Sequence, residues 1–426
     1  MKIKYCDLNI VSLRSGDEIV VNNSEIDSVP ILPQILQLTR SKLSIENDEV
    51  SCIIGVGGVK YCKDDGVNTV YSKKGILTCA WKPYISLAEL ENFLTKHGVL
   101  EEKKTLAIFN PLFSSTCIPY DNTLFCMEAF SARRLETDIT EKQFSEIVFT
   151  SNWRLRIDRG ELLLSSPIGT FYRINTGYMS TFYDEINNVY IMKSDSVVIA
   201  VNNRHNVIYV NTMDDLTLEG NLKSYQLAFL NPYYVATMFI DNNVLVKSSV
   251  GWLLIEEPHV LGIVNPRNKI IEIGKNIVLE KGEYLLLPMD GKNYGFVHNY
   301  YLSSLINSNN CIILEKNFVA YNKYLIRMYP SKALVGDLVF GEDGIVFTIF
   351  NPHENTTLIE YYAVFPFEKI TIRNAWFPEG YEPVYVKPNL ARITLRPWEV
   401  ALVSIVFRKI PIRTLKYMLF IRGSIG

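Results

Sequence analysis

The chain has 426 residues, of which 48% are hydrophobic, 12% aromatic and 21% charged. This composition supplies enough apolar material for several hydrophobic cores, which excludes disordered and fibrous proteins. Lys and Arg number 43 against 45 Asp and Glu, so the net charge of −2 gives no electrostatic case for binding nucleic acid, and we expect no nucleic-acid partner.

The N-terminal segment Met1–Leu13 alternates apolar with polar residues and lacks the continuous apolar core of a signal peptide. Nowhere does the sequence contain the run of about eighteen apolar residues that a membrane-spanning helix requires. We therefore expect a cytoplasmic protein without a membrane span.

Cysteine is concentrated in the first third of the chain. The cysteines are Cys6, Cys52, Cys62, Cys79, Cys117, Cys126 and Cys311. No two have the close spacing of a metal site, and the histidines are equally scattered, so the sequence predicts no metal and no cofactor. It favours buried free thiols, with a cross-strand disulfide Cys52–Cys62 or Cys117–Cys126 as the alternative.

A glycine-rich stretch, IIGVGGVKYC at Ile53–Cys62, follows an apolar run. A phosphate-binding loop would lead into a helix, whereas the residues after this stretch read as strand and turn. The pattern favours a glycine-rich hairpin.

Helix signals are rare. The best segment is Ser86–Gly98, where Ser86 is expected to cap the helix, Glu89 to complete a capping box and Gly98 to end it. Weaker candidates are Pro33–Leu43 and Tyr300–Ser308.

Six similar residues occur three times, as LAIFNP, LAFLNP and FTIFNP, with Asn110, Asn231 and Asn351 spaced 121 and 120 residues apart. In each copy an apolar strand is expected to end at Asn-Pro, because proline cannot donate to a strand ladder. This spacing predicts an internal duplication into tandem domains.

A second shared pattern lies downstream of two of the three copies. Ile-x-Leu, a turn, Glu and an apolar strand recur at Asn276–Pro288 and Arg392–Ser404, with Glu283 and Glu399 at matching places. A hairpin carboxylate that accepts backbone N–H groups explains both glutamates. For the first copy, Thr137–Phe149 is the candidate counterpart, although it reads equally well as a helix.

Strand and turn signals dominate the remaining sequence at the spacing of β-sandwiches. The sequence therefore predicts an all-β protein of three tandem β-sandwich-like domains, the first with one or two helices. Their expected limits are residues 1–150, 151–290 and 291–410. The tail 411–426 is either a last strand on the body or an arm that holds a neighbouring subunit.

The third unit, at Val346–Phe407, resembles the C-terminal accessory β-sandwich of glycoside hydrolases such as α-mannosidases and α-amylase-like enzymes. Leu395, Pro397 and Glu399 match the Leu-x-Pro-x-Glu of the last hairpin in those domains. The resemblance implies a sandwich fold and a link to carbohydrate enzymes, but no catalysis, because accessory domains do not carry the active site. A catalytic barrel of about 250 residues has no room here.

The candidate binding residues lie in an aromatic segment, NAWFPEGYEPVYV at Asn374–Val386. Sugars are bound by aromatic faces together with a few polar partners, a role that suits Trp376, Tyr381 and Tyr385 with Glu379 and Glu382. The alternative is that these rings seal a seam between domains. A second cluster, Glu256, Glu257 and His259, is a ligand-like group or a solvated strand end.

These observations favour a non-catalytic binding or assembly protein whose partner is carbohydrate or another protein. One alternative is a carbohydrate-active hydrolase with an acidic site between domains, so catalysis stays undecided, leaning against an enzyme. Another is a structural subunit of a large assembly such as a virus-like coat, and a homo-oligomer is compatible with each reading.

Overall fold

The computed structural model describes most of residues 85–409 and six strands before residue 85. Outside the description within that span are residues 159, 170, 222–224, 232–233, 241–243, 248–250, 257–258, 265–269, 274–275, 309–312, 319–322, 331, 375 and 378. The tail 411–426 and most of the weaker helix candidate Pro33–Leu43 also lie outside the described residues.

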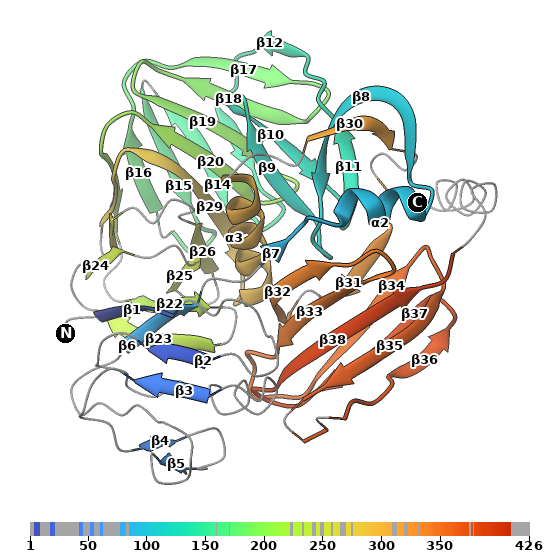
Figure 1. Cartoon of the computed structure of the whole chain (residues 1–426). Helices are drawn as coiled ribbons and strands as arrows, with labels where there is room; N and C mark the ends of the chain where they lie inside the picture. Colours follow the sequence, from blue (N-terminus) through green and yellow to red (C-terminus); the bar gives the residue numbers. More distant parts are fainter. Residues whose placement is uncertain are drawn as a thin grey trace. The chain divides into compact units, whose positions relative to one another are not determined.

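The fold is all-β, as the sequence predicts (Figure 1). Among the described residues the only helices are α2 (Leu90–Lys96) and α3 (Tyr294–Ser308). No helix in the described part of the chain is long and apolar enough to cross a membrane.

The chain forms two compact units that are interleaved in sequence. The first comprises Met1–Lys103, Asn231–Val235 and Asn317–Gly426, and the second comprises Lys104–Leu230 and Ala236–Lys316. The division into three tandem repeats, with limits at residues 150, 290 and 410, stays a prediction.

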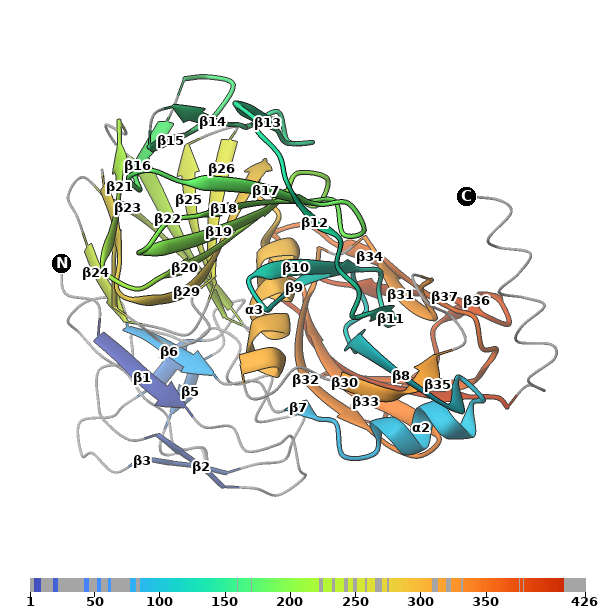
Figure 2. The same cartoon turned by 90° about the horizontal axis from the view of Figure 1, so that it is seen from above.

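Two large sheets form most of the second unit, and the views in Figures 1 and 2 show them as layers. The ten-stranded sheet runs β12 (Ile139–Glu141), β17 (Ser180–Asp184), β18 (Val189–Lys193), β19 (Val197–Asn202), β20 (Val207–Thr212), β29 (Gly282–Asp290), β26 (His259–Val264), β25 (Gly251–Glu256), β22 (Tyr225–Asn231) and β23 (Tyr234–Ile240). The eight-stranded sheet runs β13 (Glu146–Val148), β14 (Arg154–Asp158), β15 (Glu161–Ser165), β16 (Phe171–Asn175), β21 (Leu216–Gly220), β28 (Asn276–Leu279), β27 (Ile270–Ile273) and β24 (Val244–Lys247).

The core of this unit follows from period-two patterning. In β16 and β21 buried and exposed residues alternate, which places Tyr172, Ile174 and Leu218 inside. Gly262 in β26 is needed for close packing, because an added Cβ would meet Val297 Cγ2 of α3 at 2.8 Å. Helix α3 therefore packs tightly on the sheet, and it begins where the sequence supplies a cap: Asn293 Oδ1 accepts the backbone N–H of Phe296 at 3.1 Å.

Two smaller sheets complete the second unit. One is a three-stranded sheet of β11 (Ser131–Arg134), β8 (Leu100–Asn110) and β30 (Ile313–Phe318). The other is the hairpin of β9 (Thr116–Tyr120) and β10 (Thr123–Met127). Cys117 and Cys126 are direct partners in that hairpin and form a disulfide, so the favoured reading of free thiols is wrong for this pair.

The first unit contains two sheets that share a core. The four-stranded sheet runs β31 (Ile326–Tyr329), β34 (Thr357–Ala363), β37 (Leu390–Leu395) and β36 (Val384–Lys387). The five-stranded sheet runs β35 (Phe367–Arg373), β38 (Val400–Phe407), β33 (Gly344–Phe350), β32 (Leu334–Phe340) and β7 (Ile85–Ser86). The buried rings of Phe347 and Tyr361 join the two sheets, with 5.6 Å between ring centres.

Three further strand pairs belong to the first unit. They are the parallel pairs β1 (Lys4–Leu8) with β6 (Leu77–Trp81) and β2 (Glu18–Val21) with β3 (Lys42–Ile45), and the antiparallel pair β4 (Cys52–Ile54) with β5 (Lys60–Cys62). The last pair confirms the glycine-rich hairpin, and in it Cys52 lies opposite Cys62.

Helix α2 confirms the predicted helix near 86–98 but begins later than expected. Ser86 is paired in β7, and Glu89 is the N-cap residue without a side-chain cap bond, so the predicted capping box is wrong. The predicted end is confirmed: Gly98 has a φ of 68°, its N–H donates to Thr95 and the Val99 N–H donates to Leu94.

Two more sequence expectations concern strands. Thr137–Phe149 is not a helix, because it contains β12 and β13. The predicted strand–turn–Glu–strand units are not hairpins, because β28 and β29 belong to different sheets, as do β37 and β38. In both of these strand–turn–Glu–strand segments the turn carries the chain from one sheet to the other.

Candidate functional site

The predicted aromatic segment is the connection between β35 and β36, at the edge of the four-stranded sheet. All five candidate residues lie in this connection or in β36: Trp376, Glu379, Tyr381, Glu382 and Tyr385. We call residues 374–385 the aromatic loop.

Asn374 anchors the start of the aromatic loop. Its Oδ1 accepts the backbone N–H groups of Trp376 at 3.1 Å and Phe377 at 2.7 Å. Its Nδ2 donates to Glu399 Oε1 at 2.5 Å, and both Asn374 and Glu399 are buried. The backbone beneath the exposed rings is therefore fixed by a side chain from the core, as in other Asx turns.

Glu399 has the structural role that the sequence predicts. Its Oε2 accepts the backbone N–H of Arg396 at 2.7 Å, which holds the turn between β37 and β38. Burial raises the pKa of this carboxyl, while the hydrogen bonds from Arg396 and Asn374 act in the opposite direction. Because both of its carboxylate oxygens accept hydrogen bonds, Glu399 connects the turn between β37 and β38 to the aromatic loop.

Trp376 is one of the exposed rings of the loop. It is 47% exposed, and the Arg396 guanidinium lies over the indole with its central carbon 4.9 Å from the ring centre. A guanidinium at that distance is attracted to the ring by its quadrupole. Phe377 beside it is also exposed and contacts the ring of Tyr381, with 5.4 Å between centres.

The two tyrosines are held by the sheet. Tyr381 exchanges both backbone hydrogen bonds with Ile372, and the Tyr385 hydroxyl accepts the N–H of Ile370 at 2.8 Å. Burial raises the pKa of both phenols, and for Tyr381 the Glu399 carboxylate adds to the effect. Glu379 and Glu382 are exposed on the same loop.

Sequence reasoning found the rings but missed the residues that position them. Asn374 and Arg396 were not candidates, because their partners are distant in sequence: Glu399 lies opposite Asn374, and Arg396 reaches Trp376. The available signal was an asparagine directly after an alternating strand, which is typical of a side chain that organises a turn.

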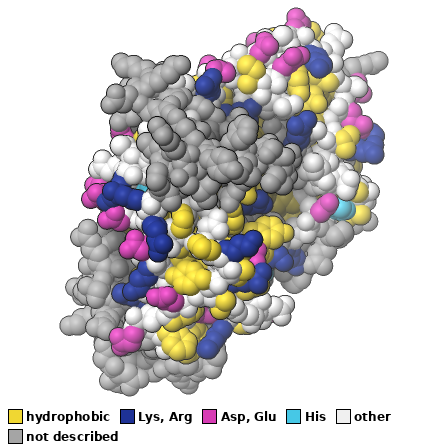
Figure 3. All heavy atoms as spheres, turned by 90° about the vertical axis from the view of Figure 1, so that its right-hand side faces the viewer, with side chains coloured by type: hydrophobic (Ala, Val, Ile, Leu, Met, Phe, Trp, Pro, Cys, Tyr) yellow, Lys and Arg dark blue, Asp and Glu magenta, His cyan; other side chains and the backbone are white. Residues whose placement is uncertain are grey.

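A second aromatic group lies on the outward side of the same sheet. The Arg327 guanidinium lies 5.6 Å from the ring centre of Tyr324 and 5.5 Å from that of Tyr329, which is 58% exposed. Tyr362 on the neighbouring β34 is 5.9 Å from Tyr324. Figure 3 looks from the right-hand side of Figure 1, where β36 and β37 lie, and shows hydrophobic side chains among Lys and Arg.

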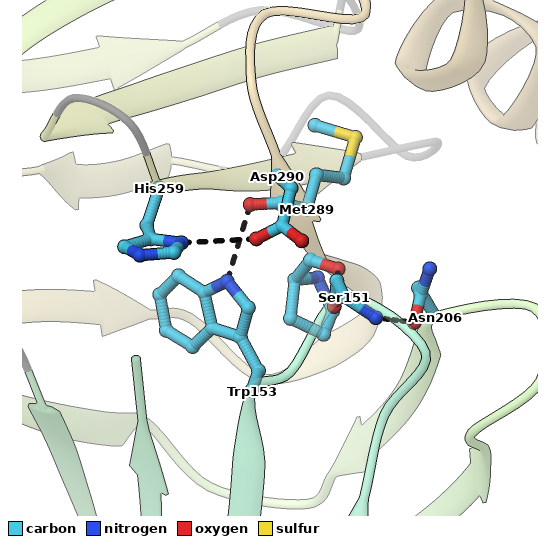
Figure 4. A network of polar contacts seen from close by, with 7 residues as sticks. Ser151, Trp153, Asn206, His259, Met289 and Asp290 are labelled. Carbon is cyan, nitrogen blue, oxygen red and sulfur yellow. Dashed lines mark hydrogen bonds and ion pairs between the residues drawn. The ribbon is translucent and has the colours of Figure 1, made fainter. Parts of the chain in front are cut away.

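The second sequence cluster, at His259, is a separate arrangement in the second unit (Figure 4). His259 Nδ1 lies 3.0 Å from Asp290 Oδ1, a partner that the sequence did not suggest, while Glu257 lies outside the described residues. The Trp153 indole N–H donates to the Met289 carbonyl at 3.1 Å, and its ring lies edge-on to His259.

Ser151 completes this network without forming a nucleophile–base pair. Its hydroxyl donates to the Pro288 carbonyl at 2.8 Å, and its backbone N–H donates to Asn206 Oδ1 at 3.1 Å (Figure 4). A serine used in this way is not activated by an imidazole. The network ties the turn before β14 to the end of β29, which is a structural role.

No protein-family model matches the chain, and no curated protein matches it by sequence. Among solved structures, an α-mannosidase from Enterococcus faecalis V583 is similar at 9% identity and a TM-score of 0.41, over 76% of this chain and 53% of that one. A glycosyl hydrolase family 38 protein from Enterococcus faecalis is similar at 10% identity and a TM-score of 0.39, over 74% and 54%.

A family 36 α-galactosidase from Geobacillus stearothermophilus is similar at 9% identity and a TM-score of 0.16, over 38% of this chain and 29% of that one. These matches are a weak structural resemblance to glycoside hydrolases, as the sequence predicts, and the chain spans about half the length of the two Enterococcus faecalis chains. At these TM-scores the likeness indicates nothing about function.

Proposed function

We propose that the protein binds carbohydrate through the aromatic loop without acting on it chemically. The observation that supports this function is the Trp376 indole, which is held half-exposed by Asn374 beneath its backbone and by the Arg396 guanidinium over its ring. A half-exposed indole whose backbone is fixed in advance offers an apolar surface to a ligand.

The chemistry of the loop fits a sugar. The C–H face of a pyranose stacks on an aromatic ring, and its hydroxyls need acceptors and donors at the rim of that ring. Phe377 and the indole face of Trp376 opposite Arg396 supply the apolar surfaces, while Glu379 and Glu382 supply exposed carboxylate acceptors. Because the backbone of Trp376 is already fixed by Asn374, little conformational entropy is lost on binding.

The test is a thermal-shift and calorimetric screen of the full chain against mono- and oligosaccharides. We expect a sugar that stabilises the protein, and Trp376→Ala should weaken its binding at least about tenfold, the usual effect of removing a central aromatic anchor. Tyr178→Ala is the matched control, because Tyr178 is 89% exposed in the other unit and should leave binding unchanged. Equal affinities for the wild type and Trp376→Ala would contradict the proposal.

A second candidate is protein binding at β36. This strand pairs only with β37 among the described strands, and Val384 is 70% exposed. A free apolar edge can accept a strand from another chain. If no sugar binds, and light scattering shows an oligomer that Val384→Lys dissociates, the edge rather than the aromatic loop carries the function.

A further inference from the structure

Three side chains of types that can ligate a metal ion lie together in the second unit, outside the aromatic loop. Cys117 and Cys126 lie opposite each other in the β9–β10 hairpin, and His205 comes from the turn between β19 and β20. The ligand atoms of all three lie within 4.8 Å of one another. The sequence could not show this group, because the histidine is far along the chain from both cysteines.

The histidine is oriented by a second side chain. Asn202 Nδ2 donates to the carbonyls of Asn187 and Asn188 at 3.3 and 3.4 Å, which turns Asn202 Oδ1 toward His205. That oxygen only accepts, so the His205 Nδ1 at 3.1 Å must carry the hydrogen. The lone pair is then on Nε2, and a fixed tautomer of this kind is the usual support of a metal-binding histidine.

The sulfur atoms are enclosed by the fold. Cys117 and Cys126 are both buried, and the Tyr300 hydroxyl of α3 donates to Cys117 Sγ at 3.5 Å. The Arg133 guanidinium donates to the Cys126 carbonyl at 2.8 Å. Tyr300 thus places one hydrogen-bond donor at a sulfur atom, and Arg133 fixes the backbone of the strand that carries the other sulfur.

The geometry points to a redox-gated site for Zn²⁺ made of Cys117, Cys126 and His205. In the oxidised protein the two sulfur atoms are bonded to each other and the site is closed. A dithiol reductant opens it: the S–S bond takes up two electrons and two protons to give two thiols, and the reductant becomes a disulfide.

Zn²⁺ then displaces the two thiol protons to solvent and binds two thiolates and the imidazole lone pair. Three protein ligands leave the fourth tetrahedral position for water, and thiolate with imidazole is a donor set that suits zinc. This site is independent of the carbohydrate proposal, since no residue is shared.

The experiment uses the full chain, reduced with dithiothreitol, desalted without oxygen and titrated with Co²⁺ as a spectroscopic probe and with Zn²⁺. We expect one equivalent of Co²⁺ with thiolate charge-transfer absorption, displaced by Zn²⁺, and no such signal from the oxidised protein. Cys126→Ser should abolish the signal, and His205→Gln should weaken binding at least about tenfold.

Two controls keep the result specific. Cys52→Ser removes a cysteine that also lies opposite another cysteine, Cys62, and should leave the signal unchanged. His205→Gln keeps both cysteines and their disulfide. If Cys126→Ser does not fold, the oxidised His205→Gln variant can be checked for folding and then reduced for the metal titration. The inference is overturned if reduced protein binds no Co²⁺, if His205→Gln binds as tightly as the wild type, or if the folded protein resists reduction altogether.

Discussion

At the scale of single residues, His97 is the most unusual titratable group. It is buried at the end of α2 among the rings of Phe93, Phe365 and Phe407, at 4.6, 5.0 and 6.1 Å between ring centres. Neither ring nitrogen has a hydrogen-bond partner among the described residues. Burial, followed by the neighbouring Lys96 charge, lowers the pKa of His97 from 6.5 to about 4.

This environment predicts acid sensitivity. Between pH 6.5 and about 4 the unfolded chain takes up a proton at His97 that the folded chain does not. The contribution of His97 to the free energy of unfolding is therefore complete above pH 6.5 and is lost as the pH falls. The loss is on the order of 3 kcal/mol of unfolding free energy. Urea unfolding at pH 7.5 and at pH 4.0 measures it.

His97→Leu provides the comparison, because it cannot titrate. Any packing cost of the substitution is the same at both pH values, so the variant should lose about 3 kcal/mol less than the wild type on acidification. A variant that loses as much stability as the wild type would show that other groups cause the acid sensitivity.

At the scale of elements, Asn110 and Asn351 make the same contacts. Each Oδ1 accepts the backbone N–H two residues on, at 3.0 Å for Asn110 and 3.2 Å for Asn351, and each Nδ2 donates to the carbonyl four residues on, at 2.9 Å. Each Nδ2 also reaches a distant turn, at Glu128 or Arg396, at 2.8 Å. The repeated Asn-Pro motif thus specifies a turn at the end of a strand, and the asparagine side chain connects that turn by a hydrogen bond to a second, distant turn.

The Asn-Pro turn shows which features of the fold can be predicted from the sequence. An apolar run before Asn-Pro predicts that a strand ends there, because both residues act locally. The partner turn is non-local, and for the first copy the sequence offers Thr137–Phe149 only as a candidate that reads equally well as a helix. In the structure, β10 and β11 flank the turn that Asn110 reaches. Phe130 has a positive φ of 42° in that turn, and Trp398 has a positive φ of 58° in the turn between β37 and β38.

In the candidate site, too, the sequence predicts the local features but not the contacts between distant segments. Trp376, Tyr381 and Tyr385 were found from composition, because aromatic rings in a turn-rich segment stand out without knowledge of the fold. Their support from Asn374 and Arg396 depends on the packing of β35 against β38, which no local pattern encodes.

Asn351→Asp tests the importance of this turn. The substitution keeps the acceptor but replaces a fully buried donor by a charged oxygen facing the Asn355 and Arg396 carbonyls. We expect the unfolding free energy to fall by about 3 kcal/mol or more, as measured by chemical denaturation.

Asn389→Asp is the matched control for that substitution. Asn389 is less buried, and its side chain makes one long hydrogen bond of 3.4 Å to the Tyr362 hydroxyl. Its substitution should cost less than about 1 kcal/mol. Equal losses at Asn351 and Asn389 would show that the Asn-Pro turn does not contribute specially to stability.

At the scale of the whole molecule, the interleaving of the two units has a consequence for folding. The second unit is almost continuous in sequence, whereas the first is assembled from segments on both sides of it. A repeated motif reveals its spacing but not which distant segments pair. β7, for example, is paired with β32 across the entire second unit.

We therefore expect residues 100–318, which keep β8 and β30 whole, to fold alone. The fragment contains both large sheets, α3 and the buried core around Tyr172 and Leu218, so its apolar interior is complete within one stretch of chain. It should unfold in one cooperative thermal transition and keep the near-ultraviolet circular dichroism of buried Trp153.

The complementary fragment, residues 1–99 joined to 319–426 by a short glycine–serine linker, is the more demanding test. Its two sandwich sheets also share a core, so it too should show a cooperative transition, provided the linker spans the ends. If the 100–318 fragment forms no cooperative structure while the full chain does, the second unit depends on the first for its stability and the two units fold as one domain.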